Sequence, residues 1–408
     1  MNRADTEDLP DSETDAPPRR RRWRRKRVLV PSTVAMFLLV GLGAAWIERE
    51  RIATNIVDDQ LAALDLPATY EVERIAGSRQ VLRDVVVGDP ASPDLTIDRV
   101  EVSLRYRLGT PEIGKVTLVN PRLFGRMVDG RMSFGTLDKV IYRDSAEPAG
   151  LPEIDLTIHD GRALMRTLYG AVGAKVEGAG LLSDGFEGTL VLVAPRLSMD
   201  DCTLQDATVF GKIDTAGGRP EFDGPIRFAS AQCPANGLAL GDTDIQFEGQ
   251  SDPAFADISG RATIAAGPLR YSDYRASGAE ATLRANWKNG LLDLRHTIAV
   301  RGLVSPQVSG ALMTVEGTLR ATDGLARLET RNRIEGNGFR PGIAFGRSLA
   351  KLEQVGAGTF VAPLAQRFAG ALAREARGSA VSADVVLRRS GRRTTVLVPQ
   401  GELRGGSG

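Results

Sequence analysis

Two hydrophobic patterns follow one another in the first part of the chain. Residues 28–47 contain no charged side chain, and a helix of that length covers about 30 Å, the thickness of the hydrocarbon core of a bilayer. Apolar residues then recur at helical spacing from Ile52 to Leu64 until Pro67 ends the pattern. The sequence therefore predicts a transmembrane helix over 28–47 and an amphipathic connecting helix over 48–66.

From Thr69 onward the hydrophobic period becomes two, which is the period of a β-strand. In Val100–Leu108 every second residue is apolar, and the residues between them are Glu, Ser, Arg and Arg. Each such segment predicts a strand with one apolar and one polar face. The same alternation occurs in Ile154–Ile158, Ile245–Phe247, Ala281–Trp287 and Leu292–Val300.

Dipeptides that are typical of tight hairpin turns separate these segments. They are Asp129-Gly130, Asp160-Gly161, Asp184-Gly185, Asp223-Gly224, Asn289-Gly290 and Asp323-Gly324. Turns between successive strands predict a mainly β protein whose sheet is one long antiparallel meander. The 45 glycines in 408 residues, more than the usual share, agree with a turn-rich chain.

Helical spacing returns near residues 345–377, inside a predicted insertion over 341–378. Its stripe consists of Val361, Leu364, Phe368 and Leu372. Such a stripe is typical of a helix that packs against the sheet; the alternative is a lid over an apolar surface. Strand-like sequence resumes from Ala380 to Val398, so we expect further strands over 379–408. The chain ends soon after Val398, as a truncated protein would.

The net charge of +1 conceals a basic segment at the start of the chain. Residues 1–27 carry nine bases and six acids, with eight of the bases between Arg19 and Arg27, whereas the rest of the chain is slightly acidic. Bases beside a first span keep that end in the cytoplasm, which places the body in the periplasm of a bacterium. A slightly acidic body argues against nucleic-acid binding. The alternative to a retained anchor is a signal peptide cleaved near Trp46, although the 20-residue apolar stretch is long for one.

The residues give no support for an enzyme. His159 and His296 are the only histidines, which argues against most metal centres and against Ser-His-Asp triads. His296 is in phase with apolar neighbours and is predicted to be a hydrogen-bonded core residue, whereas His159 is on the polar phase of its strand. No nucleotide-binding or hydrolase motif occurs, so we expect no cofactor and no metal.

The two cysteines, Cys202 and Cys233, are 31 residues apart in strand-and-turn contexts. An oxidising compartment favours a disulfide between them over two free thiols. The predicted location outside the inner membrane therefore makes the pair a candidate disulfide.

A resemblance to a known family is carried by the first stretch after the span. Its segments are Leu64–Ile75, Arg79–Val87, Leu95–Tyr106, Val116–Phe124 with an Asn-Pro-Arg-Leu run, and Asp129–Gly135 with a D-G-x-x-S-F-G turn. In this order they resemble the N-terminal module of YdbH-like proteins in the AsmA-like superfamily, to which the TamB branch also belongs. The resemblance covers residues 60–140 in motif and 20–340 in architecture.

The resemblance implies a bridge-like lipid transfer protein, in which residues 67–340 form a taco-shaped apolar groove. Phospholipids would move along it between the inner and outer membranes, with an outer-membrane partner protein a candidate participant. The acyl chains would contact the inward residues Val100, Val102, Leu104, Tyr106, Leu283, Trp287, Leu292 and Leu294. Two alternatives stay open: an outer-membrane protein assembly factor that uses exposed β-edges, and a structural envelope protein without a ligand.

Overall fold

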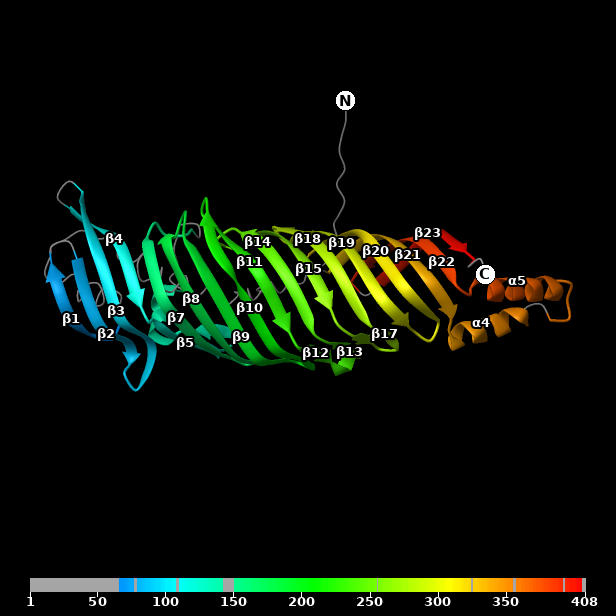
Figure 1. Ribbon diagram of the computed structural model, residues 1–408, viewed down its shortest axis with the longest axis horizontal. Helices are drawn as coiled ribbons and strands as arrows, with labels where there is room; N and C mark the ends of the chain where they lie inside the picture. Colours follow the sequence, from blue (N-terminus) through cyan, green and yellow to red (C-terminus); the bar gives the residue numbers. More distant parts are fainter. Residues whose placement is uncertain are drawn as a thin grey trace, which may run out of the picture.

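The computed structural model describes residues 66–76, 79–107, 110–141, 150–254, 256–323, 326–354, 357–391 and 393–405. Most of them belong to one sheet of 23 strands. Figure 1 shows the sheet as a long, twisted ribbon, with β1 at one end, β23 near the other and the strands oblique to the long axis. The prediction of a mainly β protein is confirmed.

The predicted arm (1–27) and span (28–47) lie outside the described residues, as does the connecting helix (48–66) except for its last residue. Leu66 is buried in the core. Among the helices that the structure does describe, none combines the length and the apolarity needed to cross a bilayer.

The first part of the sheet contains the exception to antiparallel pairing. The elements are β1 (Ala68–Ala76), β2 (Arg79–Asp89), β3 (Ser92–Arg107), β4 (Thr110–Val119), β5 (Arg122–Val128), β6 (Arg131–Ser133), the 3-10 helix η1 (Gly135–Leu137) and the four-residue helix α3 (Asp138–Ile141). The next strand, β7 (Asp155–Thr167), pairs in parallel with both β4 and β5. The antiparallel pairing is therefore interrupted at this point, because β6, η1 and α3 separate β5 from β7 in the chain and no tight hairpin joins the two strands.

After β7 the long strands follow one another in antiparallel pairs. They are β8 (Gly170–Leu181), β9 (Glu187–Met199), β10 (Cys202–Ala216), β11 (Arg219–Phe228), β14 (Thr243–Ser251), β15 (Asp257–Ala266), β18 (Gly278–Lys288), β19 (Leu291–Val304), β20 (Val308–Thr322), β21 (Arg327–Pro341), β22 (Ser379–Ser390) and β23 (Arg393–Arg404). Short segments join some of them: β12 (Ser230–Cys233), η2 (Pro234–Asn236), β13 (Leu238–Leu240), β16 (Leu269–Tyr271) and β17 (Tyr274–Ala276). These segments pair with each other and form a small ladder along one edge.

Two of the predicted turn dipeptides lie inside strands, so those two predictions were wrong. Asp160-Gly161 forms a bulge within β7, where Asp160 has a φ of 48°. Gly224 lies inside β11 opposite Gly211, and a Cβ on Gly224 would come within 2.2 Å of the Phe210 carbonyl oxygen. Glycine is required there by the close approach of two strands, which local sequence alone does not distinguish from a turn.

The buried core is concentrated in the first half of the sheet. Its large, fully buried side chains include Phe134, Leu137, Leu156, Met165, Leu182 and Phe186. Phe134 and Leu137 come from the segment around η1, which contacts β2 and β3. After Ile213 the buried apolar residues are five alanines and Phe339. The later strands therefore have little core of large side chains.

The helical insertion consists of α4 (Ile343–Glu353) and α5 (Ala362–Glu375), as the sequence predicts for this region. The prediction that the stripe packs against the sheet was wrong, because Leu364 and Phe368 are exposed while Ala365 and Ala369 are buried. Two small side chains of α5 are therefore buried while two of its large apolar ones face outward, and Leu372 is half-buried. In Figure 1 the two helices project past β23 along the long axis of the molecule.

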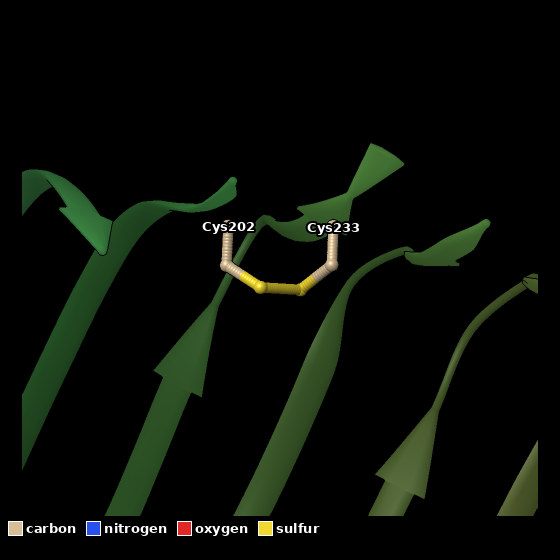
Figure 2. Close-up of a disulfide and its surroundings, with 2 residues drawn as sticks. All are labelled: Cys202 and Cys233. Carbon is tan, nitrogen blue, oxygen red and sulfur yellow. A yellow bond between two sulfur atoms is a disulfide. The ribbon is translucent and has the colours of Figure 1, made fainter. Parts of the chain in front are cut away.

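Cys202 and Cys233 are joined by a disulfide with an S–S distance of 2.07 Å (Figure 2). Cys202 is the first residue of β10 and Cys233 the last of β12. Thr203 next to Cys202 pairs with Gln232 next to Cys233. The disulfide thus fixes the short ladder to the long strands.

We expect the double variant C202S/C233S to be about 3 kcal/mol less stable than the parent chain, because the bond closes a loop of 31 residues. Urea denaturation of both proteins measures the difference, and mass spectrometry of the unreduced parent detects the bond. A parent chain with two free thiols would contradict the assignment.

One carboxylate balances the positive charges where β5 meets β7. Arg122 and Arg162 are directly opposite each other, and Lys175 of β8 lies nearby. Asp160 accepts a hydrogen bond from Arg122 Nη2 at 2.9 Å and also pairs with Arg162 and Lys175. The hydrogen bond from Arg122 holds the pKa of Asp160 below its ordinary value.

A lowered pKa means that the Asp160 charge stabilises the fold above the unfolded-state pKa of about 3.9, and that this contribution is lost as the pH falls through the folded-state value. We expect D160N to be less stable than the parent at neutral pH and the difference to shrink on acidification. Asparagine also tolerates a positive φ, so the substitution tests the charge. Denaturation curves across the acid range measure the effect; a pH-independent difference would contradict it.

Candidate functional site

A continuous row of apolar residues crosses the sheet from β5 to β22. Each residue is the register partner of the next: Leu123, Ala163, Ala174, Leu192, Val209, Ile226, Ile245, Ile264, Ala281, Ile298, Val315, Ile334 and Ala383. At about 4.8 Å per strand the row is about 60 Å long. We call the face of β14–β22 that carries this row the apolar face.

Other apolar side chains widen this row on the same strands. They include Phe247, Ala262, Leu283, Ala285, Leu294 and Leu319, with Trp287 paired with Leu292 further along. Residues of this face in β14–β22 are mostly half-buried. Half-burial combined with apolar character is what a surface presents when no second layer of protein covers it.

The structure divides the predicted lipid-contact residues into two groups. Leu283, Trp287, Leu292 and Leu294 come together on the apolar face of β18 and β19. On β3, Val100 packs against the core and Val102 is only 4% exposed, whereas Leu104 is half-buried. The side chain of Tyr106 lies outside the described part of the structure.

The opposite face of the same strands is charged. Arg227 pairs with Asp244 at 2.6 Å, and Arg320 pairs with Asp293 at 2.8 Å. Cross-strand pairs of this kind also join Arg261 to Glu248 and Arg301 to Glu280. Exposed pairs contribute little stability each, but they identify the face that is in contact with water.

An apolar cavity of about 360 Å³ lies where the covered part of the sheet meets the uncovered part. Phe222 and Phe247 stack beside it with their ring centroids 6.2 Å apart. Its other branched aliphatic lining residues are Leu95, Leu123, Ile158, Val176, Leu190, Leu192, Val209, Ile213, Ile226 and Ile258. A cavity with this lining is suited to hydrocarbon.

A polar bridge interrupts the apolar face. His296 Nε2 of β19 lies 3.0 Å from Asn332 Oδ1 of β21, which agrees with the prediction of a hydrogen-bonded histidine on the apolar side. The strand between them contributes Gly317, where a Cβ would come within 2.3 Å of Asn332 Oδ1. Glycine at this position leaves the room that the bridge needs. His159 is exposed, as its polar phase predicts.

No group of three or more His, Cys, Asp or Glu side chains in the described residues could hold a metal ion. The positive features of the site are its length, its apolar lining and its polar outer face. Together they define a β-sheet protein with one extended apolar face and one charged face.

The sequence comparisons place the chain in a family. Residues 36–408 match the YdbH-like family, described as intermembrane phospholipid transport protein YdbH. The chain therefore belongs to this lipid transport family, which confirms the resemblance seen in its sequence and extends it beyond residue 340. No curated protein and no solved structure matches the chain.

Proposed function

We propose that the chain binds phospholipid acyl chains along its apolar face and takes part in moving phospholipids between the inner and outer membranes. The lipid tails contact the half-buried residues of β14–β22, including Leu283, Trp287, Leu292 and Leu294. The polar headgroups remain at the open side, where water solvates them. The cavity beside Phe222 and Phe247 is the part of the path nearest the packed core.

The observation that carries this proposal is the unbroken apolar row from Leu123 to Ala383. A soluble sheet with one wet face would normally bury its other face under a second layer. Here the large buried side chains lie mainly in the first half of the sheet, and the row continues far beyond them. Acyl chains supply the missing apolar contact.

The location of the protein is part of the same proposal. Residues 1–27 form the cytoplasmic arm, 28–47 the inner-membrane span and 48–66 the connecting helix, while the sheet, the helical insertion (341–378) and the strands after it (379–408) lie in the periplasm. Sequencing the N-terminus of the mature protein tests the anchor. A new N-terminus near Trp46 would replace it with a cleaved signal peptide.

Site-specific photocrosslinking tests lipid binding. A photoreactive amino acid at Leu294 faces the apolar side, whereas one at the adjacent Arg295 faces the other side of the same strand. We expect ultraviolet light to attach phospholipid to the chain at position 294 and not at 295, detected by mass spectrometry. Equal labelling at both positions, or none at 294, would overturn the proposal.

A second candidate function rests on the edge strand β23. All twelve of its residues are exposed, and its described pairing is with β22 alone. An unpaired edge can add a strand from another protein, so an assembly role for outer-membrane proteins is the alternative. Crosslinks from Val396 to a protein, with no lipid attached at Leu294, would favour it over transport.

A further inference from the structure

The hairpin of α4 and α5 has an inverted arrangement of small and large apolar residues. On α5 the buried positions are Ala365 and Ala369, whereas Leu364 is 70% and Phe368 59% exposed. Phe360, just before the helix, is 94% exposed. A helix that packs in water normally buries its large side chains and exposes its polar ones. Small residues between helices and large ones outside are typical of helices that contact lipid.

Exposed apolar residues continue from the connecting turn into α5. Leu364 and Phe368 are four residues apart, which places them on one side of α5, and Phe360 lies in the turn just before this helix. Two bases lie beside these apolar residues on α5. Arg367 directly precedes Phe368, and Arg374 is seven residues after Arg367, at almost the same angle around the helix. Arginine beside an apolar stripe can place its stem on hydrocarbon and its charge among headgroups.

The charge of the hairpin is uncompensated. Residues 343–377 carry five bases (Arg347, Lys351, Arg367, Arg374 and Arg377) and two acids. None of the five bases takes part in an ion pair within the part of the chain that the structure describes. Several bases on the polar face of the sheet are paired, such as Arg320 with Asp293 and Arg227 with Asp244. The hairpin therefore offers a net positive charge to an anionic partner.

We infer that the α4–α5 hairpin docks on the surface of a bilayer that contains anionic phospholipid. Basic amphipathic helices with phenylalanine and leucine on the apolar side lie in the interface of such membranes. The hairpin projects past β23, far along the sheet from β1 (Figure 1), so it contacts a membrane at a distance from the point where the chain enters the sheet. This docking does not require the apolar face to carry lipid.

Vesicle capture by the full chain tests the inference. The chain is reconstituted into dense, sucrose-loaded phosphatidylcholine vesicles, which are mixed with light fluorescent vesicles and collected by centrifugation. We expect light vesicles containing phosphatidylglycerol to sediment with the dense ones, and pure phosphatidylcholine vesicles to remain in the supernatant. The contribution of anionic lipid is on the order of fivefold for each base that reaches the surface.

Matched variants assign the capture to the hairpin. F360S/L364S removes two exposed apolar side chains from it. L168S/M199S removes two from the sheet, where Leu168 lies in the turn after β7 and is 75% exposed and Met199 ends β9 and is 57% exposed. We expect vesicle capture to be lost in F360S/L364S and kept in L168S/M199S. The double variant R367E/R374E should weaken capture at least about fivefold, the factor expected for one base. All of the substituted residues are exposed, and circular dichroism checks that each variant folds.

Three results would overturn the inference: equal capture of neutral and anionic vesicles, full capture by F360S/L364S, or equal loss in L168S/M199S. The assay measures docking and not transfer. A failure here therefore leaves the photocrosslinking result at Leu294 intact, and a failure of crosslinking leaves docking intact.

Discussion

Replacing Leu294 by aspartate is expected to abolish phospholipid binding along the middle of the sheet. Leu294 lies between Ala285 and Leu319 on the apolar face, where an acyl chain would exclude water from the new carboxylate. An ionised group in a hydrocarbon environment is strongly unfavourable unless it is paired. A photoreactive residue at Leu283, on the neighbouring strand, reports the loss as disappearance of the lipid-labelled species.

The adjacent position provides the matched control. Arg295 is exposed on the other face, opposite Arg284, so R295D also introduces a carboxylate but places it beside a base in water. We expect the photoreactive residue at position 283 to crosslink phospholipid in R295D as it does in the parent. Retention of lipid by folded L294D, or equal loss in both variants, would remove Leu294 from the lipid path.

Strand periodicity predicted the fold class because the strands have two different faces. The alternation in Ala281–Trp287 and Leu292–Val300 predicted a hairpin, and β18 and β19 form one with Trp287 opposite Leu292. The Asn289-Gly290 dipeptide also predicted the turn between them, because this pair is typical of tight hairpins. Where a structural feature depends only on a few neighbouring residues, the sequence is sufficient to predict it.

The failures come from contacts that are distant in sequence. Asp160-Gly161 has the composition of a turn, but its surroundings on β5 and β8 make it a bulge. The parallel pairing of β7 depends on the path that the chain takes through β6 and η1. The hydrophobic period within a strand does not predict that path. Phe222 and Ile226, which line the cavity, belong to a strand that contains Gly224 and Pro225, so its sequence does not predict a strand clearly.

The candidate lipid-contact residues fall into a group that the core covers and a group on the apolar face, and contacts distant in sequence again make the difference. The patterns of Val100–Leu104 and Leu283–Leu294 are alike, since both predict an apolar face. Whether that face is covered depends on residues elsewhere: the segment around η1 supplies Phe134 and Leu137 to the core beside β2 and β3. The later strands have no comparable cover among the described residues. A period of two identifies the apolar side of a strand, and the rest of the fold determines what that side contacts.

The loss of a large side chain should therefore be costly in the packed part of the sheet. Phe186, at the turn into β9, is fully buried. A Cβ on Gly178 would come within 2.6 Å of its ring, and its backbone N–H donates to Thr215 Oγ1 at 2.9 Å. The ring thus occupies a site that glycine and the neighbouring strands have left for it.

We expect F186A to lower the free energy of unfolding by about 3–5 kcal/mol, since it removes a buried ring and leaves a cavity that the rigid strands cannot close. F360A is the matched control: Phe360 is almost fully exposed, and its truncation should change stability by less than about 0.5 kcal/mol. Urea denaturation of both variants in the same detergent measures the difference. A similar cost for the two would mean that the first half of the sheet is not a packed core.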